Sequence, residues 1–293
     1  MNKQIKVFFI GGLSNGKIVY DYLKGNKYVD LVGVITYPDD FQGARHVVFE
    51  NGRNIVKSGK CNGYERGIRD LNPNLIIVAG WSELIPNEIL EIPSMGVLGF
   101  HPAKLPMDRG RSVLAWQIED GYTETALTMF KYTDYPDGGD IIGQDIIKID
   151  HEDYISDILD KVDVATENLM KAYFPLIRQG LAKSRKQDLS EGSFRRLRNG
   201  GNSIINWNAN SETIYNKVRA ISHPYPGATT ILPLDGTEQG IYVWRSETLN
   251  DFPFGKDAKP GTLVATLYDG TLIVKTRDAY LHITDYTKIN PAE

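Results

Sequence analysis

The sequence predicts an α/β fold, in which a Rossmann-like, mostly parallel sheet carries helices on both faces and a small OB-like β-barrel follows. Three observations predict it. Continuous apolar runs alternate with helical patterns over the first part of the chain. A polar, glycine-bearing stretch occupies residues 183–202. Short alternating runs dominate residues 203–293. We therefore expect one domain over residues 1–182, a linker, and a second, β-rich domain.

The composition narrows the class of protein. The 293 residues are 41% apolar, enough for one large domain or for two ordinary ones, each with its own core. The 33 basic and 37 acidic residues are interspersed and give a net charge of −4, which argues against a broad nucleic-acid surface. Cys61 is the only cysteine, so an internal disulfide is excluded and a reducing compartment is favoured. We expect a cytoplasmic protein, because no apolar run approaches the roughly 20 residues of a membrane span.

The first strand and helix follow from "IKVFFIGG" and "GKIVYDYLKGN". Ile18, Tyr20 and Leu23 have helical spacing, and Gly25 provides a stop. The pattern then continues with strands in "LVGVITYPDD", "LNPNLIIVAG" and "SMGVLGFHP", and a short helix in "SELIPNEILEI". Ligands of such sheets bind beyond the carboxyl ends of the strands. His101 lies at one of these ends.

The next elements complete the first domain. "SVLAWQIEDG" predicts a helix that Gly121 ends, and "TALTMFKYT" predicts a strand. An apolar stripe predicts a long helix from about Tyr154 to Leu181, which we expect Pro175 to kink or end.

The C-terminal part begins with one helix. "SETIYNKVRAI" predicts this helix with Ser211 as its cap, and runs such as "GIYVWR" and "AYLHITDY" predict strands. Asp269 and Gly270 separate two alternating runs, which indicates a hairpin with a type I′ turn, where both residues need a positive φ.

His101 is the first candidate for chemistry. It follows a buried strand, and Pro102 and Pro106 stiffen the segment after it. Asp108, Arg109 and Arg111 form a polar cluster in the same segment, which favours a catalytic histidine over a core one. The other four histidines, His46, His151, His223 and His282, have no comparable setting, and we expect them to be structural.

Two further segments are candidates. Asp137 in "YPDGGD" is either a functional carboxylate or an ordinary acidic turn residue. The neighbouring Asp134 and Asp140 could suggest a cation site, but no further ligand spacing supports one, and we expect no metal. The turn at residues 11–16, "GGLSNG", is not GxGxxG; it is either a tight turn or a contact to a nucleotide phosphate or sugar.

"FHPAKLPMDRGRSVLAWQI" followed by "YPDGGDIIGQ" resembles the formyltransferases that use N10-formyltetrahydrofolate. Their signature N-x-H-x-S-L-L-P, a following R-G and a D-x-G loop correspond here to His101, Leu105-Pro106, Arg109-Gly110 and residues 137–139. The resemblance extends over nearly the whole chain. It implies a catalytic formyltransferase domain, N10-formyltetrahydrofolate as cosubstrate and a homodimer.

The stretch "HPAKLPMDRGR" is more similar to the enzymes that formylate nucleotide-linked dideoxy amino sugars for surface polysaccharides such as O-antigen. The net charge of the C-terminal part also favours a sugar acceptor. Residues 203–293 contain 8 Lys and Arg and 10 Asp and Glu, a net charge of −2, whereas a tRNA-binding domain should be basic. Methionyl-tRNA formyltransferase is the main alternative. A formyltetrahydrofolate hydrolase and a folate-binding protein without activity are two others.

The resemblance also assigns roles to residues. It implies His101 as base and oxyanion donor, with Asp137 orienting it. The signature asparagine falls at Gly99, so the oxyanion contact has to come from elsewhere, such as Lys104, a backbone N–H or a water. The folate is expected at Glu83, Leu84, Ile85, Thr133, Asp134 and Asp137. The amino-sugar nucleotide is expected at Gly12, Ser14, Lys104, Asp108, Arg109 and Arg111, because guanidinium groups bind phosphates in pairs.

Overall fold

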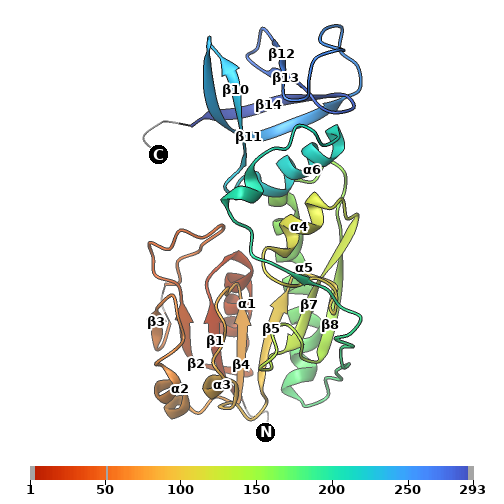
Figure 1. Cartoon of the computed structure of the whole chain (residues 1–293). Helices are drawn as coiled ribbons and strands as arrows, with labels where there is room; N and C mark the ends of the chain where they lie inside the picture. The colour runs from red at the N-terminus through yellow and green to blue at the C-terminus, as the bar shows by residue number, and fades with distance from the viewer. Residues whose placement is uncertain (1–3, 51, 290–293) are drawn as a thin grey trace. The chain divides into compact units, whose positions relative to one another are not determined.

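A computed structural model describes residues 4–50 and 52–289. The chain folds into two compact units, coloured along the chain in Figure 1. Unit 1 consists of Met1–Gly110, Glu124–Ile147 and Asp160–Arg195. Unit 2 consists of Arg111–Thr123, Lys148–Leu159 and Arg196–Glu293.

A seven-stranded sheet forms the centre of unit 1, in the order β3-β2-β1-β4-β5-β7-β8 (Figure 1). The strands are β1 (Ile5–Gly11), β2 (Val29–Thr36), β3 (Ile55–Lys57), β4 (Leu75–Ala79), β5 (Val97–His101), β7 (Glu124–Lys131) and β8 (Ile141–Lys148). The first five in this order are parallel, and β7 is antiparallel to β5. The mostly parallel sheet predicted from the sequence is confirmed.

Helices cover both faces of this sheet. On one face Phe8 of β1 belongs to a core cluster with Ile68 of α2 (Glu65–Leu71) and Ile89 of α3 (Asn87–Leu90). On the other face Phe9 contacts Tyr20 of α1 (Ser14–Gly25), with ring centroids 6.1 Å apart. Successive residues of a strand point to opposite faces, so these adjacent phenylalanines contribute to both cores.

The long helix α5 spans Ile155–Arg178. Its predicted end at Leu181 was wrong by three residues, and Pro175 lies inside the helix, one turn from its end. Phe174 and Ile177 on either side of the proline are buried, and this burial favours continuing the helix to Arg178.

Part of the predicted linker is built into unit 1. Ile141 and Arg185 exchange two backbone hydrogen bonds of 2.8 Å. Farther along, β9 (Phe194–Arg195) pairs in parallel with β6 (Arg109–Gly110). Residues 185–195 therefore contribute regular backbone pairing to this unit, although their sequence is polar and glycine-bearing.

Unit 2 contains a five-stranded antiparallel half-barrel in the order β10-β11-β14-β13-β12. The strands are β10 (Ala228–Leu234), β11 (Thr237–Leu249), β12 (Leu263–Thr266), β13 (Leu272–Lys275) and β14 (Tyr280–Lys288). The helices α4 (Val113–Glu119) and α6 (Ser211–Ile221) belong to the same unit, as does a short 3₁₀ turn, η1 (Gly200–Ser203). Asn210, rather than the predicted Ser211, caps α6, because its side chain accepts a hydrogen bond from the Thr213 amide.

The predicted type I′ turn lies in a different hairpin. Asp235 and Gly236 link β10 to β11, and both have positive φ, 54° and 80°. At the predicted position Gly270 has a φ of 85°, but the φ of Asp269 is not positive. There the Asp269 carboxylate accepts hydrogen bonds from the Thr271 amide and hydroxyl, which stabilises another turn geometry.

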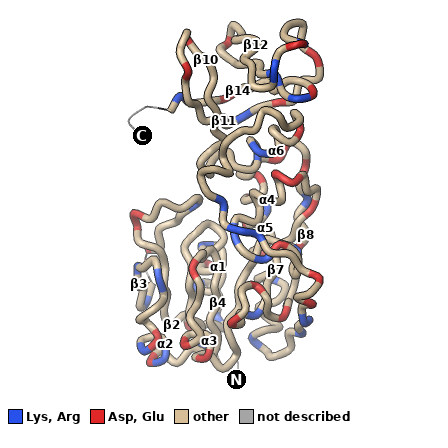
Figure 2. The backbone as a smooth tube through the Cα atoms, in the orientation of Figure 1, with Lys and Arg blue, Asp and Glu red and all other residues tan. Residues whose placement is uncertain are grey.

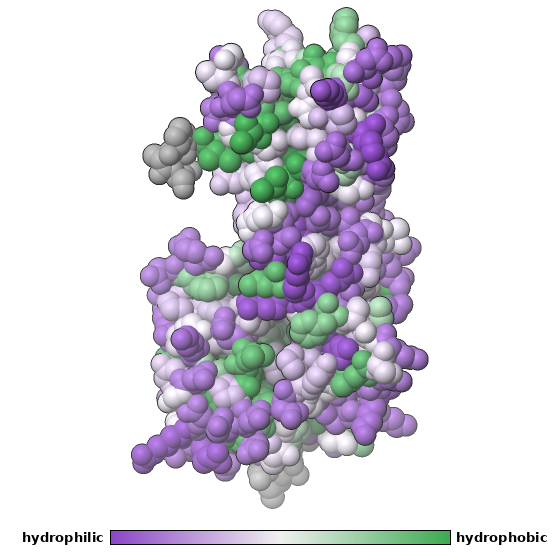
Figure 3. All heavy atoms as spheres, in the orientation of Figure 1, coloured by the Kyte–Doolittle hydropathy of each residue, from purple (hydrophilic) through white to green (hydrophobic). Residues whose placement is uncertain are grey.

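Hydrophilic residues cover much of the visible surface of both units (Figure 3). Within the part of the chain that the structure describes, no helix is long and apolar enough to cross a membrane.

Candidate active site

The candidate site lies at the carboxyl edge of the parallel strands. Strand order reverses on either side of β1, between β2 and β4, and such reversal points are where open α/β sheets bind ligands. The loops after β1 and β4 are joined there by a hydrogen bond from the Gly12 amide to the Gly80 carbonyl, 3.2 Å long. His101 ends β5, the next strand along this edge.

His101 is almost completely buried, with 5% of its surface exposed. Its Nε2 lies 2.8 Å from the backbone carbonyl oxygen of Asp108. A carbonyl can only accept, so this contact assigns the proton to Nε2 and leaves Nδ1 as the basic nitrogen. The backbone of the segment after His101 therefore orients the ring, a role that the sequence had led us to expect of Asp137.

Asp137 faces the other ring nitrogen. Its Oδ1 lies 3.5 Å from Nδ1 of His101, and its Oδ2 accepts a hydrogen bond of 2.9 Å from the Gly110 amide. The structure thus brings together the histidine and the aspartate of the two sequence motifs. A negative charge at this distance stabilises the imidazolium form when Nδ1 takes up a proton.

The loop that carries Asp137 doubles back along β7. The Lys131 amide donates to the Asp140 carbonyl at 2.9 Å, and a Cβ at Gly139 would lie only 1.8 Å from the Lys131 carbonyl oxygen. Only glycine permits so close an approach of two backbone segments. Asp137 itself has a φ of 53°, a left-handed conformation that aspartate tolerates better than most residues.

Gln187 fixes the same loop from the predicted linker. Its Nε2 donates to the backbone carbonyls of Asp137 and Gly139, at 2.8 and 2.6 Å. Sequence reasoning missed this residue, because a glutamine in a polar stretch carries no motif and only the fold brings it to the loop.

Asp108 and Arg109, two of the predicted substrate contacts, are directed into the protein. Asp108 is 1% exposed, and its Oδ1 accepts hydrogen bonds from Ser193 and from Nε of Arg195 at 2.7 Å. Arg109 is also buried; it donates to the Leu189 carbonyl. Both side chains therefore join the segment after His101 to residues 189–195.

The two other predicted cations are exposed. Lys104 pairs with Glu124, with 2.9 Å between Nζ and Oε1. Arg111 is the first residue of unit 2.

Gly12 lies in the loop after β1, and Ser14 is the first residue of α1. The Ser14 hydroxyl donates to Oδ1 of Asp163 at 3.1 Å, and Asp163 also pairs with Arg45. Burial raises the pKa of Asp163, whereas these two partners lower it. A Cβ at Gly12 would lie 2.5 Å from the ring of Tyr37, so this turn needs glycine for close packing.

The predicted folate segments differ in exposure. Leu84 is 75% exposed, Glu83 is exposed, and Ile85 is buried in the core beside α3. In the second segment Thr133 and Asp134 are exposed, and the Thr133 hydroxyl both donates to the Tyr135 carbonyl and accepts from its amide. We therefore expect these loops to contact a ligand through their backbone groups rather than through their side chains.

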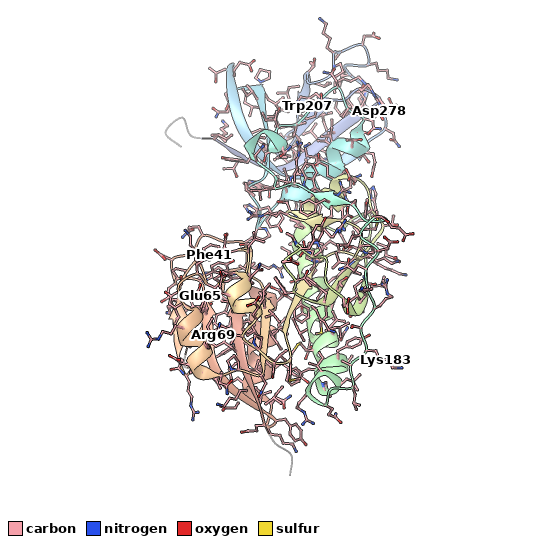
Figure 4. All side chains as sticks on the ribbon, turned by 60° about the horizontal axis from the view of Figure 1, so that its bottom comes forward. Phe41, Glu65, Arg69, Lys183, Trp207 and Asp278 are labelled. Atoms are coloured by element: carbon pink, nitrogen blue, oxygen red, sulfur yellow. The ribbon has the colours of Figure 1, made fainter. Side chains whose placement is uncertain are left out.

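Aromatic rings gather near the first of these segments, a feature that sequence reasoning missed. Tyr37 stacks on Phe41 at 3.9 Å and on Trp81 at 4.5 Å between ring centroids. Figure 4 labels Phe41 in the loop after β2. The buried indole nitrogen of Trp81 has no hydrogen-bond partner among the described residues.

Other candidate groups give no second site in the described ranges. No group of three or more His, Cys, Asp or Glu residues there is arranged to hold a metal ion. Cys61 is buried, its Sγ contacts the Leu84 carbonyl oxygen at 3.8 Å, and burial raises its pKa to about 11. The thiol is therefore protonated at neutral pH and unsuited to nucleophilic chemistry.

Known protein families match most of the chain. Residues 3–173 match the family described as Formyl transferase, and residues 200–290 match Formyl transferase, C-terminal domain. The methionyl-tRNA formyltransferase of Bacillus cytotoxicus is 30% identical over 96% of this chain and 90% of its own. The enzyme of the same name from Bacillus mycoides is also 30% identical, with the same coverage.

Solved structures share the fold. The N-formyltransferase from Helicobacter canadensis, in complex with folinic acid and dTDP-3-aminofucose, has a TM-score of 0.71 at 17% identity, covering 97% of this chain and all of that one. HypX from Aquifex aeolicus, in complex with tetrahydrofolic acid, has a TM-score of 0.70 at 18% identity over 98% of this chain. This chain spans only 45% of HypX.

The family matches cover both units, and the His101 and Asp137 motifs meet at one edge of the sheet. The chain belongs to the formyltransferase family and is an N-formyltransferase.

Proposed function

We propose that this enzyme transfers a formyl group to the amino group of a nucleotide-linked dideoxy amino sugar, at the site formed by His101 and Asp137. The formyl donor is N10-formyltetrahydrofolate. The observation that carries the proposal is the 3.5 Å approach of Oδ1 of Asp137 to Nδ1 of His101, beside a hydrogen bond that assigns the proton to Nε2.

The reaction needs a proton acceptor. The acceptor amine attacks the formyl carbon as the neutral species and must lose a proton, for which an imidazole is suited near neutral pH. In the proposed mechanism Nδ1 of His101 receives this proton. The carboxylate of Asp137 stabilises the resulting positive charge, and the Asp108 carbonyl keeps Nε2–H in place throughout.

Asp137 lies on the more accessible side of the pair. The side chain of Asp137 is 18% exposed, compared with 7% for His101. In the proposed mechanism the amine approaches from this side, and Nδ1 of His101 remains the atom that receives the proton.

The folate contacts remain those predicted from the sequence, at residues 83–85 and in the loop that includes Thr133, Asp134 and Asp137. The partly exposed ring of Trp81, which stacks on the buried ring of Tyr37 beside this segment, supports the proposal. A flat heterocycle such as a pterin can stack on an aromatic ring of this kind.

The sugar nucleotide is assigned to Gly12 after β1, to Ser14 at the start of α1, and to the exposed cations Lys104 and Arg111. Asp108 and Arg109 contribute indirectly, because their buried side chains hold the segment that orients His101. Arg111 is the proposed phosphate contact, since a guanidinium can donate to two phosphate oxygens at once.

The charge of unit 2 favours a sugar over a tRNA acceptor. This unit has 12 Lys and Arg against 16 Asp and Glu, a net charge of −4, and Figure 2 shows the two kinds interspersed. Several cations are also neutralised: Arg198 and Lys217 both pair with Glu119, and Lys288 pairs with Asp235. Binding of tRNA relies on unpaired cations that displace counterions from phosphates.

Methionyl-tRNA formyltransferase stays the second candidate, because the curated relatives at 30% identity have that name. The test incubates the full chain and N10-formyltetrahydrofolate with either nucleotide-linked 3-amino and 4-amino sugars or methionine-charged initiator tRNA. Tetrahydrofolate release and the mass of the product are measured. We expect turnover with an amino sugar only. Formylation of the tRNA, with salt-sensitive binding, would reverse the assignment.

We also propose that the enzyme is cytoplasmic and forms a homodimer. Light scattering on the purified protein tests the dimer, for which we expect a mass of twice the 32.9 kDa of one chain.

A further inference from the structure

The face of strand β5 that carries His101 has no side chain at the neighbouring position. Val97, Gly99 and His101 lie on this face, so Gly99 leaves a space directly beside His101. Formyl transfer requires a donor for the carbonyl oxygen, and Gly99 has no side chain to supply one.

The ring of Tyr132 fills this space. A Cβ built on Gly99 would lie 1.9 Å from Cε2 of Tyr132, 2.7 Å from Cδ2 and 3.0 Å from Cζ. The nearest of these atoms belongs to the half of the ring that carries the hydroxyl. The phenol therefore occupies the place of a side chain at position 99.

The position of Tyr132 in the sheet gives the ring its direction. The Tyr132 amide donates to the Val97 carbonyl at 2.8 Å, one step beyond the register pair Leu98 and Lys131. The backbone of Tyr132 thus lies opposite Val97, whereas its ring lies over Gly99. The side chain consequently extends along β5 toward the end where His101 stands.

Packing holds the ring in this place. Tyr132 stacks on Phe130, with centroids 5.2 Å apart and planes inclined by 20°. It also packs against two core clusters, one that includes Val97 and one formed by Leu105, Phe130 and Ile141. A ring confined on both sides holds its hydroxyl at a fixed position, which is what preorganised stabilisation of a charge requires.

The hydroxyl is protonated and available. Among the residues that the structure describes, none forms a hydrogen bond with Oη of Tyr132. Burial raises the pKa of Tyr132 above its usual value, and the negative charge of Asp137 raises it further.

We propose that Tyr132 is a further catalytic residue, whose hydroxyl donates a hydrogen bond to the formyl oxygen in place of a side chain at position 99. This inference rests on the proposed role of His101 and Asp137. The amine nitrogen bonds to the formyl carbon, and the bond from that carbon to N10 of the folate breaks. The amine proton passes to the His101–Asp137 pair, and N10 ends with a proton. The formyl oxygen gains negative charge during attack and loses it when the C–N10 bond breaks, and Tyr132 keeps its own proton.

The test is the variant Tyr132→Phe, which removes the hydroxyl and keeps the ring. We expect kcat to fall by about 10²–10³-fold, as for loss of one oxyanion donor. The KM for N10-formyltetrahydrofolate and the thermal midpoint should change little, because the packing contacts remain. Tyr268→Phe is the matched control, since the Tyr268 ring is fully exposed and belongs to unit 2. A Tyr132→Phe enzyme with kcat within twofold of the wild type overturns the proposal.

A second measurement separates chemistry from packing. Incorporation of 3-fluorotyrosine at position 132 makes the hydroxyl more acidic at nearly constant size, so kcat should change while the thermal midpoint does not. An unchanged kcat and pH profile would also overturn the proposal.

The assays use whichever acceptor the wild-type enzyme formylates, whether an amino-sugar nucleotide or charged tRNA, so an error in the acceptor leaves this test intact. His101→Gln is run in parallel. Full activity of His101→Gln would exclude the proposed active site as a whole. An inactive His101→Gln enzyme together with a fully active Tyr132→Phe enzyme would exclude only the proposed role of Tyr132.

Discussion

The backbone carbonyl of Asp108 accepts a hydrogen bond from Nε2 of His101 at 2.8 Å, so the residue that orients the imidazole comes from the same segment, seven positions along the chain. The opposite ring nitrogen is thereby left for Asp137, 3.5 Å away. This division of tasks between a carbonyl and a carboxylate leads to the first prediction.

His101→Gln should abolish turnover, because it removes the basic nitrogen. Asp137→Asn should lower kcat by about 10²–10⁴-fold, because it removes the charge that stabilises the imidazolium. Steady-state formylation measures both effects. His282→Gln in β14 serves as the control and should keep full activity, since His282 lies in the antiparallel sheet of unit 2, where its Nε2 contacts the Thr271 hydroxyl. An active Asp137→Asn enzyme would exclude that carboxylate from the reaction.

Gln187→Leu should loosen the loop of Asp137, because it removes hydrogen bonds to the carbonyls of Asp137 and Gly139. We expect kcat to fall about tenfold and the free energy of unfolding to fall by about 1–3 kcal/mol. Gln179→Leu, which removes an exposed bond to the Pro175 carbonyl, is the control and should change neither quantity measurably. Equal behaviour of the two variants would show that Gln187 does not position the loop.

Asp108→Ala should destabilise the protein strongly. Asp108 is buried and pairs with Arg195 at 2.7 Å, and breaking a buried pair costs about 3–5 kcal/mol, with the lower end expected because Arg195 is partly exposed. Urea unfolding measures the difference. The exposed pair of Lys17 and Asp21 provides the control, since Asp21→Ala should cost less than about 1 kcal/mol. A loss of similar size in both variants would contradict the structural role of Asp108.

Gly99→Ala should destabilise the protein by about 1–3 kcal/mol, the usual cost of overpacking. The reason is the 1.9 Å distance between the added Cβ and the ring of Tyr132. Gly67→Ala in α2 meets no atom within 4 Å and should stabilise the helix by up to about 1 kcal/mol. Thermal unfolding of the two variants should therefore shift in opposite directions; a neutral Gly99→Ala would mean that the ring of Tyr132 moves aside at no cost.

Cys61 should make the protein less stable at high pH. Its pKa is about 11 in the folded state, against 9.0 for an ordinary thiol, so the folded state binds the proton more tightly. The contribution to stability is full below pH 9 and is lost as pH rises toward 11. Comparing the unfolding free energies of wild type and Cys61→Ala across this range isolates the effect. A constant difference between the two proteins from about pH 8 to about pH 11 would contradict it.

The sequence predicted β1, β2, β4, β5 and β7, because apolar strands carry a strong local signal, but it did not predict β3 or β8. His101 and Asp137 could also be proposed, from the prolines and glycines around them. The direction of β7 could not be predicted from the sequence. This strand runs antiparallel to β5, and only the return of the loop along β7 brings Asp137 back to His101.

The misplaced features depend on contacts between distant residues. Asp108 and Arg109 look like ligand-binding charges, but their partners lie 80 or more positions away, at Leu189, Ser193 and Arg195. Likewise, the residue types predict a type I′ turn at Asp269-Gly270, but of these two hairpins only the one at Asp235-Gly236 has positive φ at both residues. Local residue types do not encode such distant partners.

The segment from Arg185 to Arg195 has a practical consequence for dividing this enzyme. A shortened chain that ends with the last residue of α5 would lack Gln187, Ser193 and Arg195, and with them the hydrogen bonds that immobilise the Asp137 loop and bury Asp108. Anyone expressing the catalytic half alone should keep every residue up to 195, even though the family match for that half stops at residue 173.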